Sequence, residues 1–168
     1  MNKNIILFDF DGVILDSFRT AFAVNKIVCP DISEEHYRQF FEGNIFEEKE
    51  SGDIHSERCR HDDFWAHYIP RLKREGTLVP GMGTVVKELS QGNTLIVVSS
   101  GMTDFIEAFL DSQSLLSSFA RVMGNDVHKS KEEKIRMVFS EYGDASASDC
   151  VFITDTLGDI REAERTEI

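Results

Sequence analysis

Basic residues are scarce in this chain. Its 168 residues include 18 lysines and arginines against 30 aspartates and glutamates, which gives a formal net charge of −12. Nucleic acids and anionic membranes need a basic face for binding, so this balance argues against both as partners. It does not argue against a small anionic substrate, because a bound metal ion and one lysine can reverse the field locally.

Cysteines and long apolar runs are also few. Cys29, Cys59 and Cys150 are odd in number and have no spacing typical of a metal site, which predicts reduced thiols. No apolar stretch is long enough to span a membrane, and the short run before Asp9 does not resemble a signal peptide. We therefore expect a cytoplasmic protein. The chain length suits one domain with a core and a small insertion.

The most informative segment is the apolar run that starts at Ile5 and ends in Asp9, Asp11 and Gly12. A buried strand would carry the two aspartates to one edge of a sheet, facing the same way, since side chains alternate along a strand. Two neighbouring buried carboxylates need a cation or a shared proton. The segment predicts a Mg²⁺-assisted site in which one aspartate attacks and the other transfers protons. A solvated turn after a strand is the alternative.

Three further short apolar runs resemble the first, and helical patterns alternate with them. Near-continuous apolar runs are typical of parallel strands buried on both faces. The predicted strands are 94–98, 119–123 and 150–153. The helical patterns cover 84–89, 104–110 and 131–142. Ser130 and Glu133 form a capping box at the start of the last helix. The alternation predicts an α/β fold built on a doubly wound parallel sheet.

Residues 17–78 break this alternation, because they are more polar and carry no convincing strand. Their patterns predict helices over 18–27, 34–41 and roughly 61–74. About 60 residues are too many for an ordinary connection. We predict a small helical cap at 17–78 on an α/β core formed by 1–16 and 79–168; two ordinary crossover helices are the alternative. The aromatic side chains expected to form the core of the cap and its contact with the sheet are Phe18, Phe22, Phe40, Phe41, Phe46, Phe64 and Trp65.

Polar side chains follow the predicted strands at their carboxyl ends, where open α/β sheets bind ligands. They are Asp9, Asp11, Ser99, Lys131 or Lys129, Asp155 and Asp159. Phosphoryl transfer uses such a set. It needs a carboxylate nucleophile, a hard cation held by carboxylate oxygens, and a hydroxyl and a lysine on the phosphoryl oxygens. It also needs a second acid for the leaving group and then for water.

Four motifs, in order, resemble those of the haloacid-dehalogenase-like (HAD) superfamily, in the branch with a helical cap inserted after the first strand. The segment from Asp9 to Val13 resembles the DxDG(V/T) motif, and Ser99 resembles the Thr/Ser motif. Lys131 or Lys129 resembles the lysine motif, and the segment 155–159 resembles the DxxxD acidic motif. Each motif alone is weak, whereas four in the right order at the right strand ends are a strong signal.

The resemblance implies a magnesium centre and two reacting carboxylates. Asp9 would be the nucleophile and a Mg²⁺ ligand. Asp11 would be the general acid/base, and its main-chain carbonyl would also reach the metal. Asp155 would bind Mg²⁺, supported by Asp159 directly or through water. Taken alone, Asp155 and Asp159 are also explained as acids favoured by the dipole at a helix N-terminus.

The resemblance also implies a set of residues that binds the phosphoryl group. Ser99, Ser100 and Gly101 would bind it together with a lysine. Taken alone, Ser99 is equally explained as a helix N-cap. Lys131 matches relatives whose lysine stands four residues before the first buried position of the helix, whereas Lys129 fits the Lys-Pro pattern of other relatives; we favour Lys131.

The second aspartate, Asp11, decides between the reactions of the superfamily. Dehalogenases attack carbon and lack an acid at that position, so its presence favours phosphatase or phosphomutase chemistry. We expect a Mg²⁺-dependent hydrolase of small phosphorylated metabolites that works through an aspartyl-phosphate on Asp9. A sugar-phosphate mutase and a non-catalytic binding protein that keeps the fold are the alternatives. Arg38 or Arg19 could hold a substrate anion, although a surface ion pair is the simpler role for each.

The chain departs from the family pattern at two places. Thr154 stands before Asp155 where relatives usually have glycine, and this stiffens the turn. Relatives also continue beyond the position of Ile168 with a small-residue turn and a fifth core strand, which we expect to be absent here. An exposed sheet edge would be an aggregation liability. We expect another element, or a second copy of the chain in a homo-oligomer, to cover it.

Overall fold

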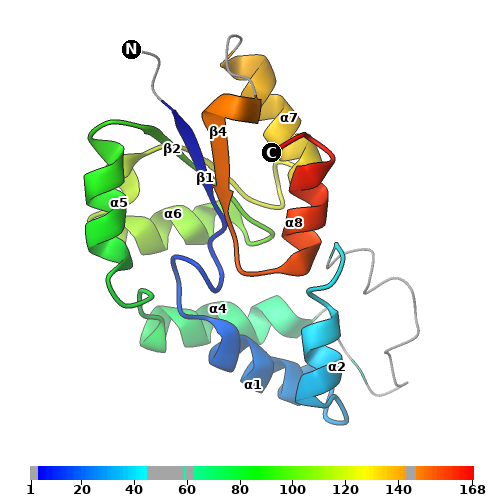
Figure 1. Ribbon diagram of the computed structural model, residues 1–168. Coiled ribbons are helices and arrows are strands. Elements are labelled where there is room, and N and C mark those ends of the chain that lie inside the picture. Colours follow the sequence, from blue (N-terminus) through cyan, green and yellow to red (C-terminus); the bar gives the residue numbers. More distant parts are fainter. Residues whose placement is uncertain (1–3, 45–58, 60–62, 143–146) are drawn as a thin grey trace.

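A parallel sheet lies at the centre of the computed structural model, which describes residues 4–44, 59, 63–142 and 147–168. The sheet has the strand order β3-β2-β1-β4 (Figure 1). The strands are β1 (Ile5–Phe8), β2 (Thr94–Val98), β3 (Phe119–Met123) and β4 (Cys150–Ile153). All four apolar runs of the sequence form these strands, so the predicted α/β fold is confirmed.

Helices cover both faces of the sheet. Alternate strand residues point to opposite faces, so Phe8 and Leu7 belong to two different apolar clusters. Phe8 shares its cluster with residues of α5 (Met82–Ser90) and α6 (Thr103–Ser112). Leu7 shares its cluster with residues of α7 (Lys131–Glu141) and α8 (Leu157–Glu164). The sheet is therefore doubly wound, as predicted. Each fully buried apolar side chain in these clusters stabilises the fold by about 1.5–3 kcal/mol.

The helix boundaries differ from the predicted ones by one or two residues. Gly81 adopts a φ of 84° and turns the chain into α5 before the apolar pattern begins. At the start of α7, the hydroxyl of Ser130 accepts a hydrogen bond from the backbone N–H of Glu133 at 3.3 Å, as the capping pattern predicts. Two short 3₁₀ helices, η2 (Leu116–Ser118) and η3 (Ala147–Asp149), lead into β3 and β4.

Three further helices lie between β1 and α5. They are α1 (Phe18–Val28), α2 (Glu34–Gln39) and α4 (Phe64–Glu75). Figure 1 shows them gathered beyond the carboxyl ends of the strands. Residues 61 and 62 of the predicted third helix, and Phe46, lie outside the described residues. These helices meet the core through an antiparallel link, in which Asp16 N donates to Thr77 O and Val79 N donates to Ile14 O, both at 2.9 Å. The cap limits 17–78 stay a prediction.

The prediction that all three cysteines are reduced thiols is wrong for two of them. Cys29, at the end of α1, forms a disulfide with Cys59, and their Cα atoms lie 4.1 Å apart. Cys150 is a free, buried cysteine. The pairing joins residues 30 positions apart through the folding of the inserted segment, and no local spacing in the sequence signals it. The thiols therefore lend no support to a cytoplasmic location, which stays a prediction.

The strand β4 forms one edge of the sheet in the part of the chain that the structure describes. Among the described residues, this sheet has four strands. Val151 of β4 is 57% exposed. That another element or a second copy covers this edge stays a prediction. Among the described residues, no helix is both long and apolar enough to cross a membrane.

Candidate active site

A buried lysine lies between two carboxylates at the carboxyl end of the sheet. Asp9 continues β1, and its N–H donates to Ile153 O at 2.9 Å. Its carboxylate Oδ1 lies 2.8 Å from Lys131 Nζ, which in turn lies 2.6 Å from Asp159 Oδ2. All three side chains are buried. The structure thus brings together residues from the ends of β1, α7 and α8 that the sequence predicted to meet.

The two carboxyl groups beside Lys131 differ in acidity. Burial raises the pKa of Asp9 well above its usual value, and Lys131 offsets this only in part. Burial acts in the same direction on Asp159, but Lys131 and a hydrogen bond from Thr154 Oγ1 at 2.5 Å hold the pKa of Asp159 below its usual value. Burial disfavours the charge of Lys131, yet the two carboxylates keep its pKa above the usual value. Additional positive charge beside Asp9 would favour its ionised form.

The second aspartate of the first motif contacts the inserted helices. The hydroxyl of Tyr68, on α4, donates a hydrogen bond to Asp11 Oδ1 at 2.6 Å. Burial raises the pKa of Asp11, while hydrogen bonds from Tyr68 and Ser17 act to lower it. The sequence patterns did not single out Tyr68. Its spacing from Phe64 and Trp65, at i+4 and i+3 on one helix face, is the signal that points to it.

Gly12 allows the acidic pair of the last motif to approach the first. It adopts a φ of 80°, and a Cβ at this position would lie 2.1 Å from Asp155 Oδ2. Thr156 caps α8 by accepting a hydrogen bond from Asp159 N at 3.3 Å. Asp159 is therefore an acid in the first turn of a helix, as the alternative interpretation holds. Its carboxylate nevertheless pairs with Lys131 inside the site.

Ser99 lies at the end of β2 and belongs to the same site. Its hydroxyl accepts a hydrogen bond from Gly101 N at 2.9 Å. The N-cap of α6 is Met102, so Ser99 does not cap that helix. A Cβ on Gly101 would lie 3.6 Å from Asp11 Oδ2, and Ser100 lines the same cavity as Asp11. The structure thus gathers Ser99, Ser100 and Gly101 beside the predicted acid/base.

The two candidate lysines lie in different places. Lys131 is buried beside Asp9, whereas Lys129 is at an exposed position. A third lysine, Lys134, is fully buried and was not predicted; its Nζ donates to Ser99 O at 2.5 Å and to Gly124 O at 3.3 Å. It stands three residues after Lys131 on α7, which is the spacing that places both on one helix face.

Glu162 is a further buried residue that the sequence analysis missed. Its carboxylate accepts hydrogen bonds from Asn44 Nδ2 at 2.9 Å and from Ser130 Oγ at 3.0 Å. A longer bond of 3.3 Å comes from the backbone N–H of Lys131. Glu162 therefore fixes the start of α7, and with it the backbone of Lys131. It follows Asp159 by three residues on α8, a spacing that would have indicated the shared face.

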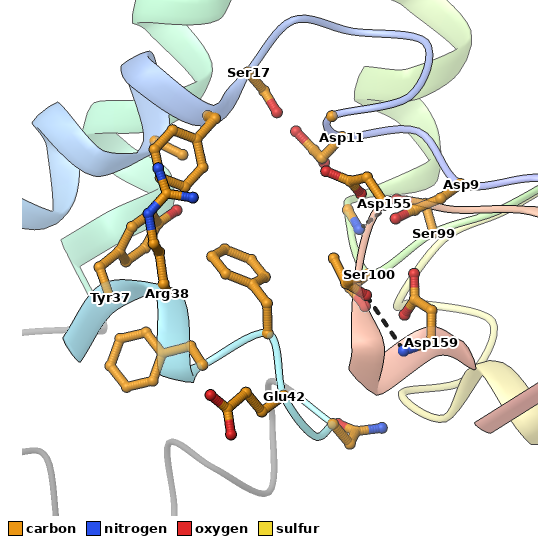
Figure 2. Close-up of a pocket in the computed structure, with 18 of the residues that line it drawn as sticks. Asp9, Asp11, Ser17, Tyr37, Arg38, Glu42, Ser99, Ser100, Asp155 and Asp159 are labelled. Carbon is orange, nitrogen blue, oxygen red and sulfur yellow. Dashed lines mark hydrogen bonds between the residues drawn. The ribbon is translucent and has the colours of Figure 1, made fainter. Parts of the chain in front are cut away.

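A cavity of about 370 Å³ is lined at one end by the predicted site residues, which are Asp9, Asp11, Ser99, Lys131, Asp155 and Asp159. Figure 2 shows Tyr37 and Arg38 facing Asp9, Asp11, Asp155 and Asp159 across it. Residues that follow β1, β2 and β4, together with the start of α7, provide the aspartates, Ser99 and Lys131. Helices α1, α2 and α4 provide mostly aromatic side chains on the opposite side. The arrangement suits a ligand with an anionic end at the aspartates and lysine and a second part that reaches the inserted helices.

The donor set fits magnesium. Among the described residues, no three or more His, Cys, Asp or Glu side chains form a group that could hold a metal ion. Mg²⁺ does not need so many, because it keeps several waters and binds through one or two carboxylates. Figure 2 shows Asp155 beside Asp9 and Asp11, so carboxylates from both acidic motifs lie together. Burial raises the pKa of Asp9, and a cation bound beside it would act in the opposite direction.

The fold and the site together are those of an α/β enzyme whose acidic centre lies at the end of the first strand. Comparison with protein families identifies it further, because residues 6–168 match the model of haloacid dehalogenase-like hydrolases. The chain belongs to this family and is a hydrolase, which confirms the resemblance seen in the sequence motifs.

Individual relatives agree with this assignment. A phosphoglycolate phosphatase of Synechococcus elongatus is 28% identical over 171 residues, which cover 95% of this chain and 78% of that protein. A haloacid dehalogenase-like hydrolase from Streptococcus pneumoniae has a TM-score of 0.80 at 18% identity, over 99% of this chain and 82% of that one. The HAD-hydrolase YfnB from Bacillus subtilis, solved bound to magnesium, has a TM-score of 0.68 at 16% identity, over 100% of this chain and 87% of that one. The two structural likenesses support the fold, and the roles of single residues stay predictions.

Proposed function

We propose that the chain is a Mg²⁺-dependent phosphomonoester hydrolase of small phosphorylated metabolites that works through an aspartyl-phosphate on Asp9. The observation that carries this proposal is the meeting of Asp9, Asp11 and Lys131 at one end of a single cavity. The relative named as a phosphoglycolate phosphatase supports the same class of reaction. The magnesium bound to YfnB supports the choice of metal.

In the first half-reaction, a carboxylate oxygen of Asp9 attacks the phosphorus and the bond from phosphorus to the ester oxygen breaks. Asp11 gives its proton to the departing oxygen, so the alcohol leaves neutral. The raised pKa of Asp11 favours holding that proton before the reaction. Tyr68 donates to Oδ1 of Asp11, whereas Oδ2 lies on the side of Gly101, so Oδ2 would be the oxygen that transfers the proton.

In the second half-reaction, water attacks the phosphorus of the aspartyl-phosphate. The proton of the water passes to Asp11, and the bond from phosphorus to the Asp9 oxygen breaks. Orthophosphate leaves, and both aspartates return to their initial protonation states. Throughout, the Lys131 ammonium and the Ser99 hydroxyl would stabilise the charge on the phosphoryl oxygens.

Mg²⁺ would be held by the carboxylates of Asp9 and Asp155 and by the main-chain carbonyl of Asp11, with Asp159 in support. When bound, it supplies positive charge that reduces the repulsion between the Asp9 carboxylate and the incoming phosphate. Lys131 cannot supply this charge alone, because it is shared with Asp159.

The proposal predicts that Asp9→Asn abolishes phosphate release, because an amide cannot act as the nucleophile. The measurement is phosphate release from a panel of phosphorylated metabolites, with Mg²⁺ and with excess chelator. Far-UV circular dichroism checks that the variant is folded. Asp111→Asn, an exposed residue of α6, is the matched control and should keep the wild-type rate. Unchanged turnover in Asp9→Asn would sink the mechanism. Isomerisation of a sugar phosphate with little net phosphate release would favour the mutase instead.

A further inference from the structure

Aromatic rings form the side of the cavity that faces the aspartates. One group surrounds Tyr37, whose ring centroid lies 5.6 Å from that of Phe18 and 5.1 Å from that of Phe41. A second group lies on α4, where the centroid of Tyr68 is 4.8 Å from Phe64 and 5.8 Å from Trp65. The two groups come from different helices of the inserted segment, and members of both line the cavity.

Packing of the inserted helices against the sheet explains only some of these rings. Tyr37, Phe64 and Tyr68 are buried, as core residues are. Phe41 and Trp65 are only partly buried and line the cavity. Neither side chain forms a hydrogen bond or ion pair with the predicted reacting groups in the described part of the chain. Their exposed ring surface is therefore available to a ligand.

The charges around the cavity oppose an anionic group on this side. Among the described lining residues, the cations are Lys131 and Arg38. Lys131 lies at the other end, between Asp9 and Asp159. Arg38 pairs with Glu34 at 2.7 Å, and its guanidinium carbon lies 4.4 Å from the centre of the Phe18 ring. The remaining charged groups of the described lining are acidic, and of these Glu42 follows α2.

From these observations we infer that the substrate is a phosphomonoester whose alcohol carries an uncharged planar ring. The phosphate lies at Asp9, and the ring lies against Trp65 and Phe41. Aromatic surfaces stack favourably on flat rings and attract no carboxylate. The cavity of about 370 Å³ has the size of sites that hold larger organic ligands, and glycolate would fill little of it. This inference rests on the proposed function, because it assumes that the ester is cleaved at Asp9.

The test compares benzyl phosphate with 2-phosphoglycolate as substrates of the wild-type enzyme. We expect a higher kcat/KM for benzyl phosphate. In Trp65→Leu the kcat/KM for benzyl phosphate should fall by about 2- to 10-fold, the range for one aromatic contact, mainly through KM. The kcat/KM for 2-phosphoglycolate should stay near its wild-type value. Phe22→Leu is the matched control, because Phe22 packs on Tyr37 at 5.4 Å outside the described lining.

The outcomes separate this inference from the proposed function. Faster cleavage of 2-phosphoglycolate, or equal losses for both esters in Trp65→Leu, would overturn the ring specificity and leave a working phosphatase. A loss in Phe22→Leu as large as in Trp65→Leu would overturn it too, because the effect would then come from cap packing. If neither these esters nor the metabolite panel yields phosphate, the proposed function fails and this inference with it.

Discussion

Lys134 is a fully buried lysine whose amine contacts the loop that carries Ser99. Burial lowers its pKa to about 8, and the charge of Lys131 acts in the same direction. The neutral amine still carries two N–H groups, so it can keep its hydrogen bonds to Ser99 O and Gly124 O without its charge. Lys134 therefore supports the loop that we predict to bind the phosphoryl group, at a cost in stability that depends on pH.

The sign of this dependence follows from the direction of the shift. The pKa of Lys134 is about 8 in the folded chain against a usual 10.5, so between these values the unfolded chain binds more protons and stability rises with pH. The whole shift is worth about 3 kcal/mol. The test is to measure the free energy of unfolding of wild type and of Lys134→Met by urea titration at several pH values. From about pH 7 to about pH 10.5, the stability of wild type relative to the variant should increase by up to about 3 kcal/mol. A difference that stays constant over this range would contradict the burial of a titrating amine.

The helix α8 connects the sheet to the loop after α2. The backbone N–H of Gly158 donates to Phe41 O at 2.8 Å, and the Arg161 side chain donates to Glu42 O. Asn44 completes the contact through Glu162. The same helix carries Asp159 to Lys131. One short element therefore positions both an acidic residue of the site and the loop that lines the cavity.

This contact depends on the absence of a side chain at Gly158. A Cβ there would lie 2.2 Å from Gly43 O, so the loop or the helix would have to move. We expect Gly158→Ala to lower the free energy of unfolding by about 1–3 kcal/mol, the usual cost of overpacking, and to lower kcat/KM because the displaced loop lines the cavity. Gly92→Ala is the matched control, since nothing lies within 4 Å of its Cβ position. Equal stabilities of the two variants in urea titrations would show that the loop is not held against α8.

Across the whole molecule, local patterns predict the sheet domain better than the contacts between the sheet and the inserted helices. Near-continuous apolar runs indicate the parallel strands. Because ligands bind at the carboxyl ends of such strands, the sequence also predicts that Asp9, Ser99 and Asp155 lie together. The hydrogen bond from Tyr68 to Asp11 depends on how α4 folds over the sheet. Hydrophobic periodicity does not tell how close α4 comes to the end of β1. The same reason explains why the sequence did not reveal the pairing of Cys29 with Cys59.

The disulfide is a covalent link within the inserted segment. It joins the end of α1 to Cys59 and closes a loop with a sequence separation of 30. Cross-linking a loop of this size removes conformational freedom from the unfolded chain and stabilises the fold by about 2–4 kcal/mol. We expect reduction of the wild type, and the double change Cys29→Ser with Cys59→Ser, to lower the free energy of unfolding by this amount in urea titrations.

The matched comparison is the double variant with and without reductant, which should show no difference because Cys150 is the one cysteine it keeps. Thiol titration of the denatured, unreduced wild type should count one free cysteine, Cys150. A count of three would show that all three cysteines are reduced thiols, as the sequence predicts. In that case the inserted helices would be held to each other and to the sheet by packing and hydrogen bonds alone, and the reductant would leave the urea midpoint of the wild type unchanged.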